Sequence, residues 1–332
     1  MKKFLALTMA LCMIFAMCAF SASADEPITL TYAEVNPLDG TIVGAMAKAF
    51  KEKVEELSGG AVVIDIQASG VLGSEDQILD NLLGGGNITD ISRISAFALT
   101  QYGCDKASLL SIPYTFVNED HFWKFADSEL AQEFLNEPQE IGLPLRGLCY
   151  GEEGFRHFFF KNEVKGLEDM KGLKIRVSSD PVMTGMVTNL GASATSVPFT
   201  ELYSALNTGV VDGAEQPTAN YRSNAFQEVA PYLLLDGHTL GALQIVITDT
   251  GWNKLNEEQQ GWIMEAAKYA SSVCREQVGK VEAETFELLE KDGATVIPVE
   301  DKGPWVEACQ PTIKANTEKL ADLYAELVAM AG

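Results

Sequence analysis

Histidine is scarce in this sequence, where only three occur among 332 residues. His121, His157 and His238 are scattered and show none of the HxxxH or HExxH spacings that commonly hold metal ions. A GxSxG nucleophile elbow and a nucleotide-binding loop are missing as well. We therefore predict no enzyme, no metal site and no cofactor. The adjacent Glu152 and Glu153 could be imagined as an acid and a base, but we interpret them as a solvated turn.

Positive charge is also in short supply. The chain has 24 Lys and Arg against 47 Asp and Glu, a formal net charge of -23. Such a surface repels nucleic acid and anionic lipid, so we predict no nucleic-acid partner. It does not attract an anionic solute either. A site for an organic acid would therefore have to be a local, enclosed cluster of positive groups.

Long apolar runs are missing outside the N-terminus. Two lysines precede an apolar run at residues 4–20, and Ala-Ser-Ala at 22–24 has the small-x-small pattern that signal peptidase cuts. We predict a signal peptide at residues 1–24, cleaved after Ala24, and a periplasmic mature protein. No later stretch approaches the roughly 20 apolar residues of a membrane-spanning helix, so we predict no direct membrane insertion.

Cysteine is sparse, and its spacing is uninformative. Lipid anchoring at Cys18 is the weaker alternative to cleavage, because the preceding Met17 is not small. No CxxC pair suggests a metal site. Outside the cytoplasm, buried free thiols and one or two disulfides are both open for the four cysteines that follow the leader. These are Cys104, Cys149, Cys274 and Cys309.

Strand-like and helix-like patterns alternate in two blocks, which is typical of an open α/β sheet. The first block has stretches at 28–33, 41–57, 61–67 and 76–83. The second has stretches at 173–177, 181–190, 194–197 and 201–206. Residues 257–292 contain no proline and carry an apolar stripe, which predicts a helix of roughly 54 Å that could reach both blocks. A break at Gly279 is the alternative. A last helical stretch at 305–330 is expected to be interrupted or restarted near Pro311.

Several motifs resemble those of the solute-binding subunits of tripartite ATP-independent periplasmic (TRAP) transporters, the DctP-like family. They occur in order over nearly the whole mature chain. They are YAEVNP (32–37), GVLGS (70–74), SIPYTF (111–116), GLKIRV (172–177), LGA (190–192), VPFTELYSAL (197–206), GVVDGAEQP (209–217) and GHT (237–239).

The resemblance implies an α/β, two-domain periplasmic-binding-protein fold with crossing hinge strands and a long domain-spanning helix. Domain I would comprise residues 25–153 and about 239–280. Domain II would comprise 154–238 and about 281–332. The chain would cross near Glu153 and recross near His238, which we predict to act at the hinge rather than on the ligand.

Two arginines are the main predicted ligand residues. Arg176 lies inside a predicted strand, where an unpaired charge is costly unless a partner or a cavity receives it. It matches the family's carboxylate-binding arginine, and its planar guanidinium can donate two parallel hydrogen bonds to a carboxylate. Arg156 matches a second arginine of the family. The alternatives are a strand-edge arginine facing water for Arg176 and a structural salt bridge for Arg156.

Six further residues complete the predicted site. Phe199 matches an aromatic that covers the bound acid, with an ordinary core phenylalanine as the alternative. Gln216 stands where many relatives have asparagine, so ligand size or shape should differ. Arg93 could meet a second carboxylate or lie at the surface. The remaining candidates are Asn36, which could instead form a turn before Pro37, Ser95 and Tyr203. Asp212 and Glu215 are interpreted as structural.

The predicted function is extracytoplasmic capture of a small organic acid and its delivery to the membrane subunits of a TRAP-type transporter. The ligand-binding subunit of an ABC importer and that of a membrane sensor are the alternatives.

Overall fold

The computed structural model describes residues 26–332, so the predicted signal peptide and its cleavage site lie outside the described residues. A nine-stranded mixed sheet runs through the molecule in the order β2-β1-β3-β8-β4-β7-β5-β6, with β9 paired to β8. The strands are β1 Ile28–Ala33, β2 Val62–Gln67, β3 Ile91–Ser95, β4 Leu145–Phe160, β5 Lys174–Val177, β6 Ser193–Ser196, β7 Gly213–Pro217, β8 Tyr232–Thr248 and β9 Thr295–Pro298.

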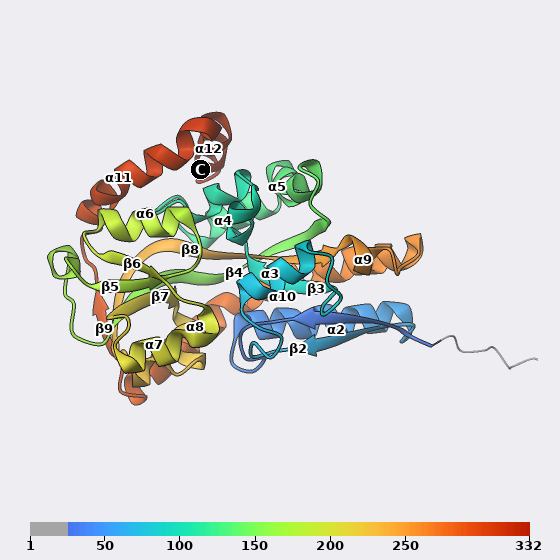
Figure 1. Cartoon of the computed structure of the whole chain (residues 1–332), viewed down its shortest axis with the longest axis horizontal. Coiled ribbons are helices and arrows are strands. Elements are labelled where there is room, and N and C mark those ends of the chain that lie inside the picture. The colour runs from blue at the N-terminus through green and yellow to red at the C-terminus, as the bar shows by residue number, and fades with distance from the viewer. Residues whose placement is uncertain (1–25) are drawn as a thin grey trace, which may run out of the picture.

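Helices cover the sheet on both faces, as an α/β fold requires. Figure 1 shows α6, α11 and α12 on one face and α7 and α8 on the other. The helices are α2 Ile42–Ser58, α3 Glu75–Leu83, α4 Glu119–Ala126, α5 Glu129–Glu140, α6 Pro181–Asn189, α7 Leu202–Thr208, α8 Thr218–Ser223, α9 Asp249–Trp252, α10 Glu257–Lys291, α11 Gly303–Thr317 and α12 Ala321–Ala329.

Two groups of parallel strands define two lobes. In the first lobe β1 pairs in parallel with β2 and β3, and α2 and α3 belong to it. In the second lobe β5 pairs in parallel with β6 and β7, with α6, α7 and α8 around them. Figure 1 shows the first lobe (blue) and the second (yellow-green) at opposite ends of the molecule. This confirms the predicted fold class.

The long strands β4 and β8 join the lobes. They have 16 and 17 residues and pair antiparallel along most of their length. Their register shifts between Glu152 and Phe155. Gly154 and Gly237 both have positive φ, 81° and 57°, which glycine adopts without steric cost. The irregular backbone therefore lies where the crossings are predicted, near Glu153 and His238, while the domain boundaries stay a prediction.

The first helix shows how local sequence sets the element bounds. Thr41 precedes α2, and its hydroxyl accepts a hydrogen bond from the backbone N–H of Gly44 at 3.0 Å. Gly59 ends the helix in the left-handed conformation with φ 58°, as glycine commonly does. The apolar side chains Met46 and Phe50 are fully buried in the core between α2 and the first-lobe strands.

The predicted long helix is continuous. Helix α10 has 35 residues and begins with a capping box formed by Asn256 and Gln259, so it extends over about 52 Å. Gly279 lies within it and does not break it. Its first part packs into the core that holds α2, whereas Leu289 belongs to the second-lobe core with Phe159. One rod thus contacts both lobes.

The interruption predicted at Pro311 is wrong. Helix α11 continues through Pro311, and the change of structure falls at Glu318–Leu320, a short 3-10 turn before α12. Proline removes one backbone hydrogen bond from a helix, but Trp305 and Cys309 on the same helix are buried in the second-lobe core and hold it in place. Packing therefore outweighs the local signal.

The described residues show neither disulfides nor membrane spans. Cys104, Cys149, Cys274 and Cys309 are free and buried, which favours the interpretation as small apolar residues. No helix within residues 26–332 combines the length and apolarity that crossing a bilayer needs.

Candidate functional site

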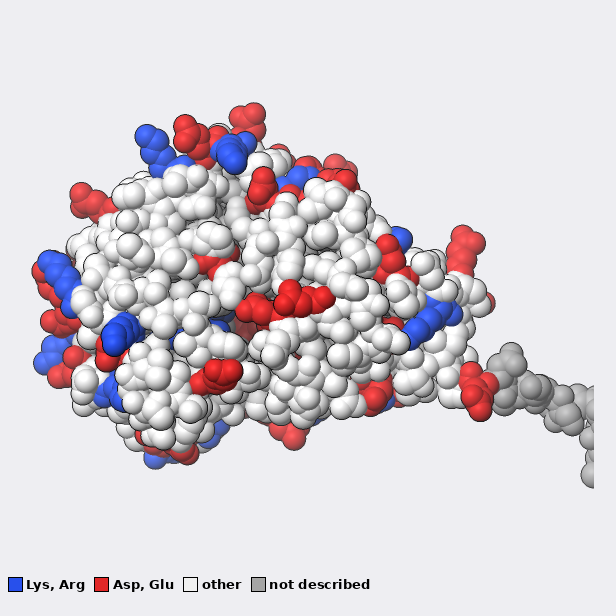
Figure 2. Space-filling model, in the orientation of Figure 1, with Lys and Arg blue, Asp and Glu red and all other residues white. Residues whose placement is uncertain are grey.

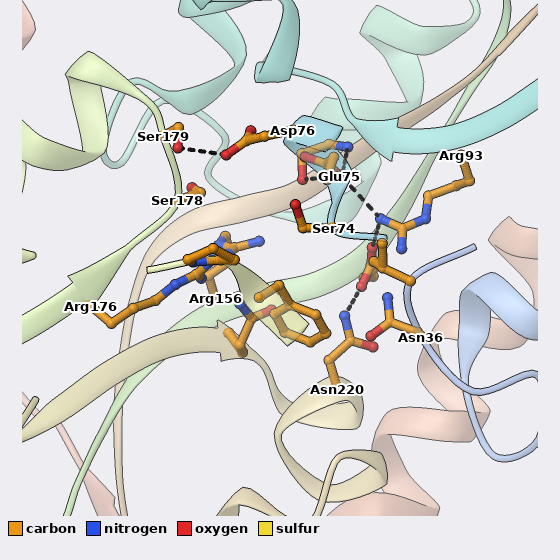
Figure 3. A pocket seen from close by; sticks show the side chains of 16 residues that line it. Asn36, Ser74, Glu75, Asp76, Arg93, Arg156, Arg176, Ser178, Ser179 and Asn220 are labelled. Carbon is orange, nitrogen blue, oxygen red and sulfur yellow. Dashed lines mark hydrogen bonds and ion pairs between the residues drawn. The ribbon is translucent and has the colours of Figure 1, made fainter. Parts of the chain in front are cut away.

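A cavity lies between the two lobes, at the carboxyl ends of their parallel strands. It measures about 540 Å³ when the open space at its mouth is included. Figure 3 shows side chains from several elements converging on it. It is lined by Val35, Asn36, Ser74, Glu75, Asp76, Arg93, Ser95, Glu153, Arg156, Arg176, Ser178, Ser179, Pro198, Phe199, Gln216 and Asn220.

Arg176 in β5 is a buried cation whose polar contact within the protein is a single backbone oxygen. Its side chain is 4% exposed, and its Nε donates to the carbonyl of Val197 at 2.9 Å. The ring of Phe199 lies 5.9 Å from the guanidinium carbon, a cation–π distance. Within residues 26–332 no ion pair includes Arg176. Every other arginine has one, namely Arg93, Arg146, Arg156, Arg222 and Arg275.

Burial without a carboxylate changes the electrostatics of Arg176. Loss of hydration lowers the pKa of Arg176 to about 10, with Glu215 opposing the shift and Arg156 adding to it. The side chain still carries its charge at neutral pH. An uncompensated buried charge is costly, and an anionic group between the lobes would relieve that cost.

Arg156 in β4 is already held by a protein carboxylate. Its Nε and Nη2 donate to the two oxygens of Glu215 in β7, at 2.5 and 3.0 Å. Glu215 also lies 3.5 Å from the Nε2 atom of His238. Burial alone would raise the pKa of Glu215, but Arg156 and His238 lower it to about 2. These contacts are compatible with the structural role predicted for Glu215, and Arg156 meets the cavity with its charge compensated.

His238 lies beneath this pair and is fully buried. Its Nδ1 is 2.7 Å from Asp236, and its ring packs 4.5 Å from that of Phe158. Burial opposes a charge on the ring, but Asp236 and Glu215 outweigh it and raise the pKa of His238 to about 9. His238 does not line the cavity, and its position on a crossing strand is compatible with the predicted hinge role.

Arg93 in β3 is surrounded by carboxylates. It donates from Nε and Nη2 to Glu34, and its Nη1 lies 3.5 Å from Glu153 and 3.8 Å from Glu75. Its side chain is 3% exposed, so the surface alternative is wrong. Because three acidic groups already compensate one guanidinium, little attraction is left for a second carboxylate of a ligand.

The aromatic and amide candidates face the cavity. Gln216 in β7 is 5% exposed, and its side-chain amide has no hydrogen-bond partner within residues 26–332. Phe199 follows β6 and stands edge-on to Phe226 at 5.8 Å. Asn36 bonds to Glu34 and accepts from Asn224 at 3.3 Å.

Ser95 also lines the cavity, but Tyr203 does not. The backbone N–H and hydroxyl of Ser95 donate to Glu75 at 2.9 and 3.3 Å. Tyr203 is 38% exposed, and its hydroxyl donates to Glu228 at 2.8 Å. The motif that contains Tyr203 is helical in α7, which turns the ring away from the cavity toward the surface.

The solvated turn predicted at Glu152 and Glu153 is wrong. Both residues lie in β4, with exposures of 0% and 7%. Trp123 donates to Glu152 at 3.1 Å, and burial raises the pKa of Glu152 to about 8. Glu153 accepts from Asn220 and lies against Arg93. Two adjacent glutamates suggest an exposed turn from the local sequence. Here they are buried, because their partners Trp123, Asn220 and Arg93 come from distant parts of the chain.

Sequence reasoning also missed the start of α3. Ser74, Glu75 and Asp76 line the cavity, and Ser74 forms a capping box with Gln77. The S-x-x-Q spacing at 74–77 could have located this helix start. Asp76 accepts a hydrogen bond from Ser179 of the second lobe at 2.8 Å, so this helix start closes the cavity from the first lobe. Residues 26–332 contain no group of His, Cys, Asp or Glu arranged to hold a metal ion.

The comparisons with known proteins agree on one family. A family model described as bacterial extracellular solute-binding protein, family 7, matches residues 32–320. The sialic acid-binding periplasmic protein SiaP of Vibrio cholerae is 27% identical over 293 residues, 88% of this chain and 89% of SiaP. The C4-dicarboxylate-binding periplasmic protein DctP of Rhodobacter capsulatus is 25% identical over 311 residues, 92% of this chain and 90% of DctP.

A solved structure shares the fold over almost the whole chain. It is that of a TRAP periplasmic solute-binding protein from Pseudomonas putida F1 with bound D-glucuronate. The TM-score is 0.86 with 29% identity, and the match covers 90% of this chain and 96% of the other.

Proposed function

The chain belongs to bacterial extracellular solute-binding protein family 7, and from that premise we propose that Arg176 binds the carboxylate of a small organic acid held between the two lobes. The resemblance to TRAP solute-binding proteins is confirmed. The protein captures a carboxylate solute for a TRAP-type transporter, and the ABC-importer and sensor alternatives have no support among the relatives.

One observation supports the role of Arg176 above the others. This guanidinium is buried, lines the cavity and has no carboxylate partner within the described residues. Its Nη1 and Nη2 have no hydrogen-bond partner there either, and two parallel donors suit the two oxygens of a carboxylate. The P. putida relative binds D-glucuronate, a carboxylate, which is consistent with the assignment.

Closure of the lobes accompanies binding in this proposal. Asp76 and Ser179 bond across the cavity, and so do Asn36 and Asn224. The domains would be 25–153 with about 239–280, and 154–238 with about 281–332. They would rotate at the irregular crossings, with His238 at one of them. The acid stabilises closure because it binds the closed form preferentially.

Export and docking complete the proposal. The relatives SiaP and DctP are periplasmic, and we place this chain there after cleavage following Ala24. The membrane subunits of a TRAP transporter would receive the acid. Phe199 would cover the ligand, and Gln216 would contact it with its unpartnered amide.

The test is calorimetric titration of Arg176→Ala with the acid that raises the melting temperature most in a panel of mono-, di- and sugar acids. Loss of one side of a buried charge pair should weaken binding by about 30-fold to a few thousand-fold, roughly 2–5 kcal/mol. Arg222→Ala is the matched control, because Arg222 pairs with Asp292 and does not line the cavity. Binding by Arg176→Ala within about threefold of the unmodified protein would refute the role.

A further inference from the structure

The hydrogen-bonding groups left free in the cavity differ between its two ends. At one end they are donors. Arg176 has two nitrogens, Nη1 and Nη2, without a protein partner, and Nη1 of Arg156 has none either among the described residues. Both side chains line the cavity; Arg156 lowers the pKa of Arg176, whereas Glu215, Glu75 and Asp76 raise it. This end suits the carboxylate of the proposed ligand.

The other end has a surplus of acceptors. Figure 3 shows Arg93 on the opposite side of the cavity from Arg176. There the single guanidinium of Arg93 meets Glu34, Glu75 and Glu153. Figure 2 shows acidic side chains gathered beside the recess in the middle of this face. No excess of positive charge remains at this end.

Two oxygens at the acceptor end lack donors from the protein. Glu75 accepts from Ser95 with Oε2, whereas its Oε1 has no hydrogen-bond partner among residues 26–332. Asn220 donates its amide to Glu153, and its Oδ1 is likewise without a partner there. Both side chains line the cavity. Acceptors of this kind are satisfied by hydroxyl groups and repel a carboxylate.

The middle of the cavity has polar groups that can form hydrogen bonds with the hydroxyl groups of a ligand. The hydroxyl oxygen of Ser178 is buried without a partner in the described part of the chain. The Gln216 amide, also unpartnered there, supplies both a donor and an acceptor. Buried polar groups left unsatisfied cost free energy, so a ligand that bonds to them gains affinity over one that does not.

From this polarity we infer that the ligand is a monocarboxylate bearing several hydroxyl groups, a sugar acid, with its carboxylate on Arg176 and its far hydroxyls on Glu75 and Asn220. The inference rests on the proposed function of Arg176 and excludes dicarboxylates, whose second charge would enter the acidic end. Burial raises the pKa values of Glu75 and Glu153. Their environment therefore already disfavours negative charge, and another anion there would add to that cost.

Matched acids test separately, in the unmodified protein, the preference for a single carboxylate and the preference for hydroxyl groups. In the aldarates D-glucarate and D-galactarate, a second carboxylate replaces the terminal CH2OH group of the corresponding aldonates, D-gluconate and D-galactonate, and the four CHOH groups between are the same. Hexanoate and adipate repeat the comparison without hydroxyls, and D-glucuronate and D-galacturonate add the ring form. Calorimetric titration should show the best hydroxylated monocarboxylate binding at least about tenfold more tightly than its aldarate and than hexanoate, about 1.4 kcal/mol. A smaller ratio in either comparison overturns the inference.

The result also distinguishes this inference from the function on which it rests. Tight binding of adipate or an aldarate that Arg176→Ala abolishes would overturn the ligand class and leave the role of Arg176 intact. Binding of none of these acids would count against both.

A substitution at Glu75 tests whether this residue causes the preference for aldonate over aldarate. Glu75→Gln keeps an acceptor oxygen and removes the charge, so the preference for aldonate over aldarate should shrink by at least about threefold. Asp80→Asn is the control, because Asp80 lies on the same helix, is exposed and bonds to Tyr102 away from the cavity. An unchanged preference in Glu75→Gln, with its melting temperature retained, would remove Glu75 from the proposal. The comparison of acids on the unmodified protein decides the ligand class independently of this variant.

Discussion

Three buried arginines line one cavity, and they divide into two kinds. Arg93 and Arg156 are compensated within the protein by Glu34 and Glu215. Arg176 is as deeply buried but has only a backbone oxygen and an aromatic ring beside it. Arginine side chains thus occur in this one site both with and without a carboxylate partner. In our proposal the paired arginines hold the walls of the cavity together, and the unpaired Arg176 binds the solute.

The pairing partners explain why the first kind is structural. Glu34 follows β1 and joins it to Arg93 in β3, while Glu215 in β7 joins Arg156 in β4. Each pair fixes neighbouring strands relative to one another, so removal of one partner would strand a buried charge. That cost is larger than the worth of the pair itself.

Glu215→Gln tests this with the largest expected effect. The change leaves Arg156 without its carboxylate and removes the charge beside His238, so the free energy of unfolding should fall by about 3–5 kcal/mol. Urea denaturation of the ligand-free protein measures it. The control Glu228→Gln alters an exposed carboxylate bonded to Tyr203, and should stay within about 0.5 kcal/mol. A loss in Glu215→Gln no larger than that of the control would show that the pair is not structural.

The dependence of stability on pH sharpens the same comparison. The folded pKa of His238 is about 9 and its ordinary value is 6.5, so its contribution to stability is complete below pH 6.5. The contribution is lost as the pH rises through 9, because the unfolded chain releases the proton first. Glu152, with a folded pKa raised to about 8, shifts stability in the same direction from pH 4.5 upward. Stability should therefore fall on the alkaline side, with His238 supplying on the order of 3 kcal/mol.

Substitution of the histidine isolates its share of this effect. Urea denaturation at pH 6 and at pH 9.5 should show a smaller difference for His238→Gln than for the unmodified protein. The remaining slope belongs to Glu152 and other groups. Equal differences for the two proteins would mean that His238 is not charged within the Arg156 cluster.

Local patterns predicted the elements of the fold because their causes are local. Alternation gives β1 at Ile28–Ala33, as predicted from the residues. The absence of a breaker predicted α10, and the glycine after residue 58 marks the end of α2. Pro311 did not mark a helix end, because the burial of Trp305 and Cys309, which depends on the tertiary structure, keeps α11 helical.

The site was predictable only in part, because its partners are distant in sequence. Arg93 and Glu34 are separated by 59 residues, as are Arg156 and Glu215. No sequence pattern indicates which arginine forms an ion pair with which carboxylate. The family resemblance placed Arg176 and Arg156 in one predicted site, but it could not reveal that only Arg156 has a carboxylate partner within the described residues. The acceptor end, with Glu75 and Asn220, followed from neither periodicity nor motif.

Arg176→Met tests the other half of the comparison, with the smallest expected effect. In the ligand-free protein this change removes a buried charge that has no carboxylate partner and replaces it with an apolar side chain of similar length. The free energy of unfolding should therefore stay within about 1 kcal/mol of the unmodified value or rise slightly, since buried charges replaced by apolar groups are often neutral or stabilising. Urea denaturation without ligand measures it beside Glu215→Gln. A loss as large as that of Glu215→Gln would place Arg176 among the structural arginines and remove the distinction between the two kinds. Unchanged stability combined with lost binding would mean that the charge is maintained for the solute alone, at no benefit to the fold.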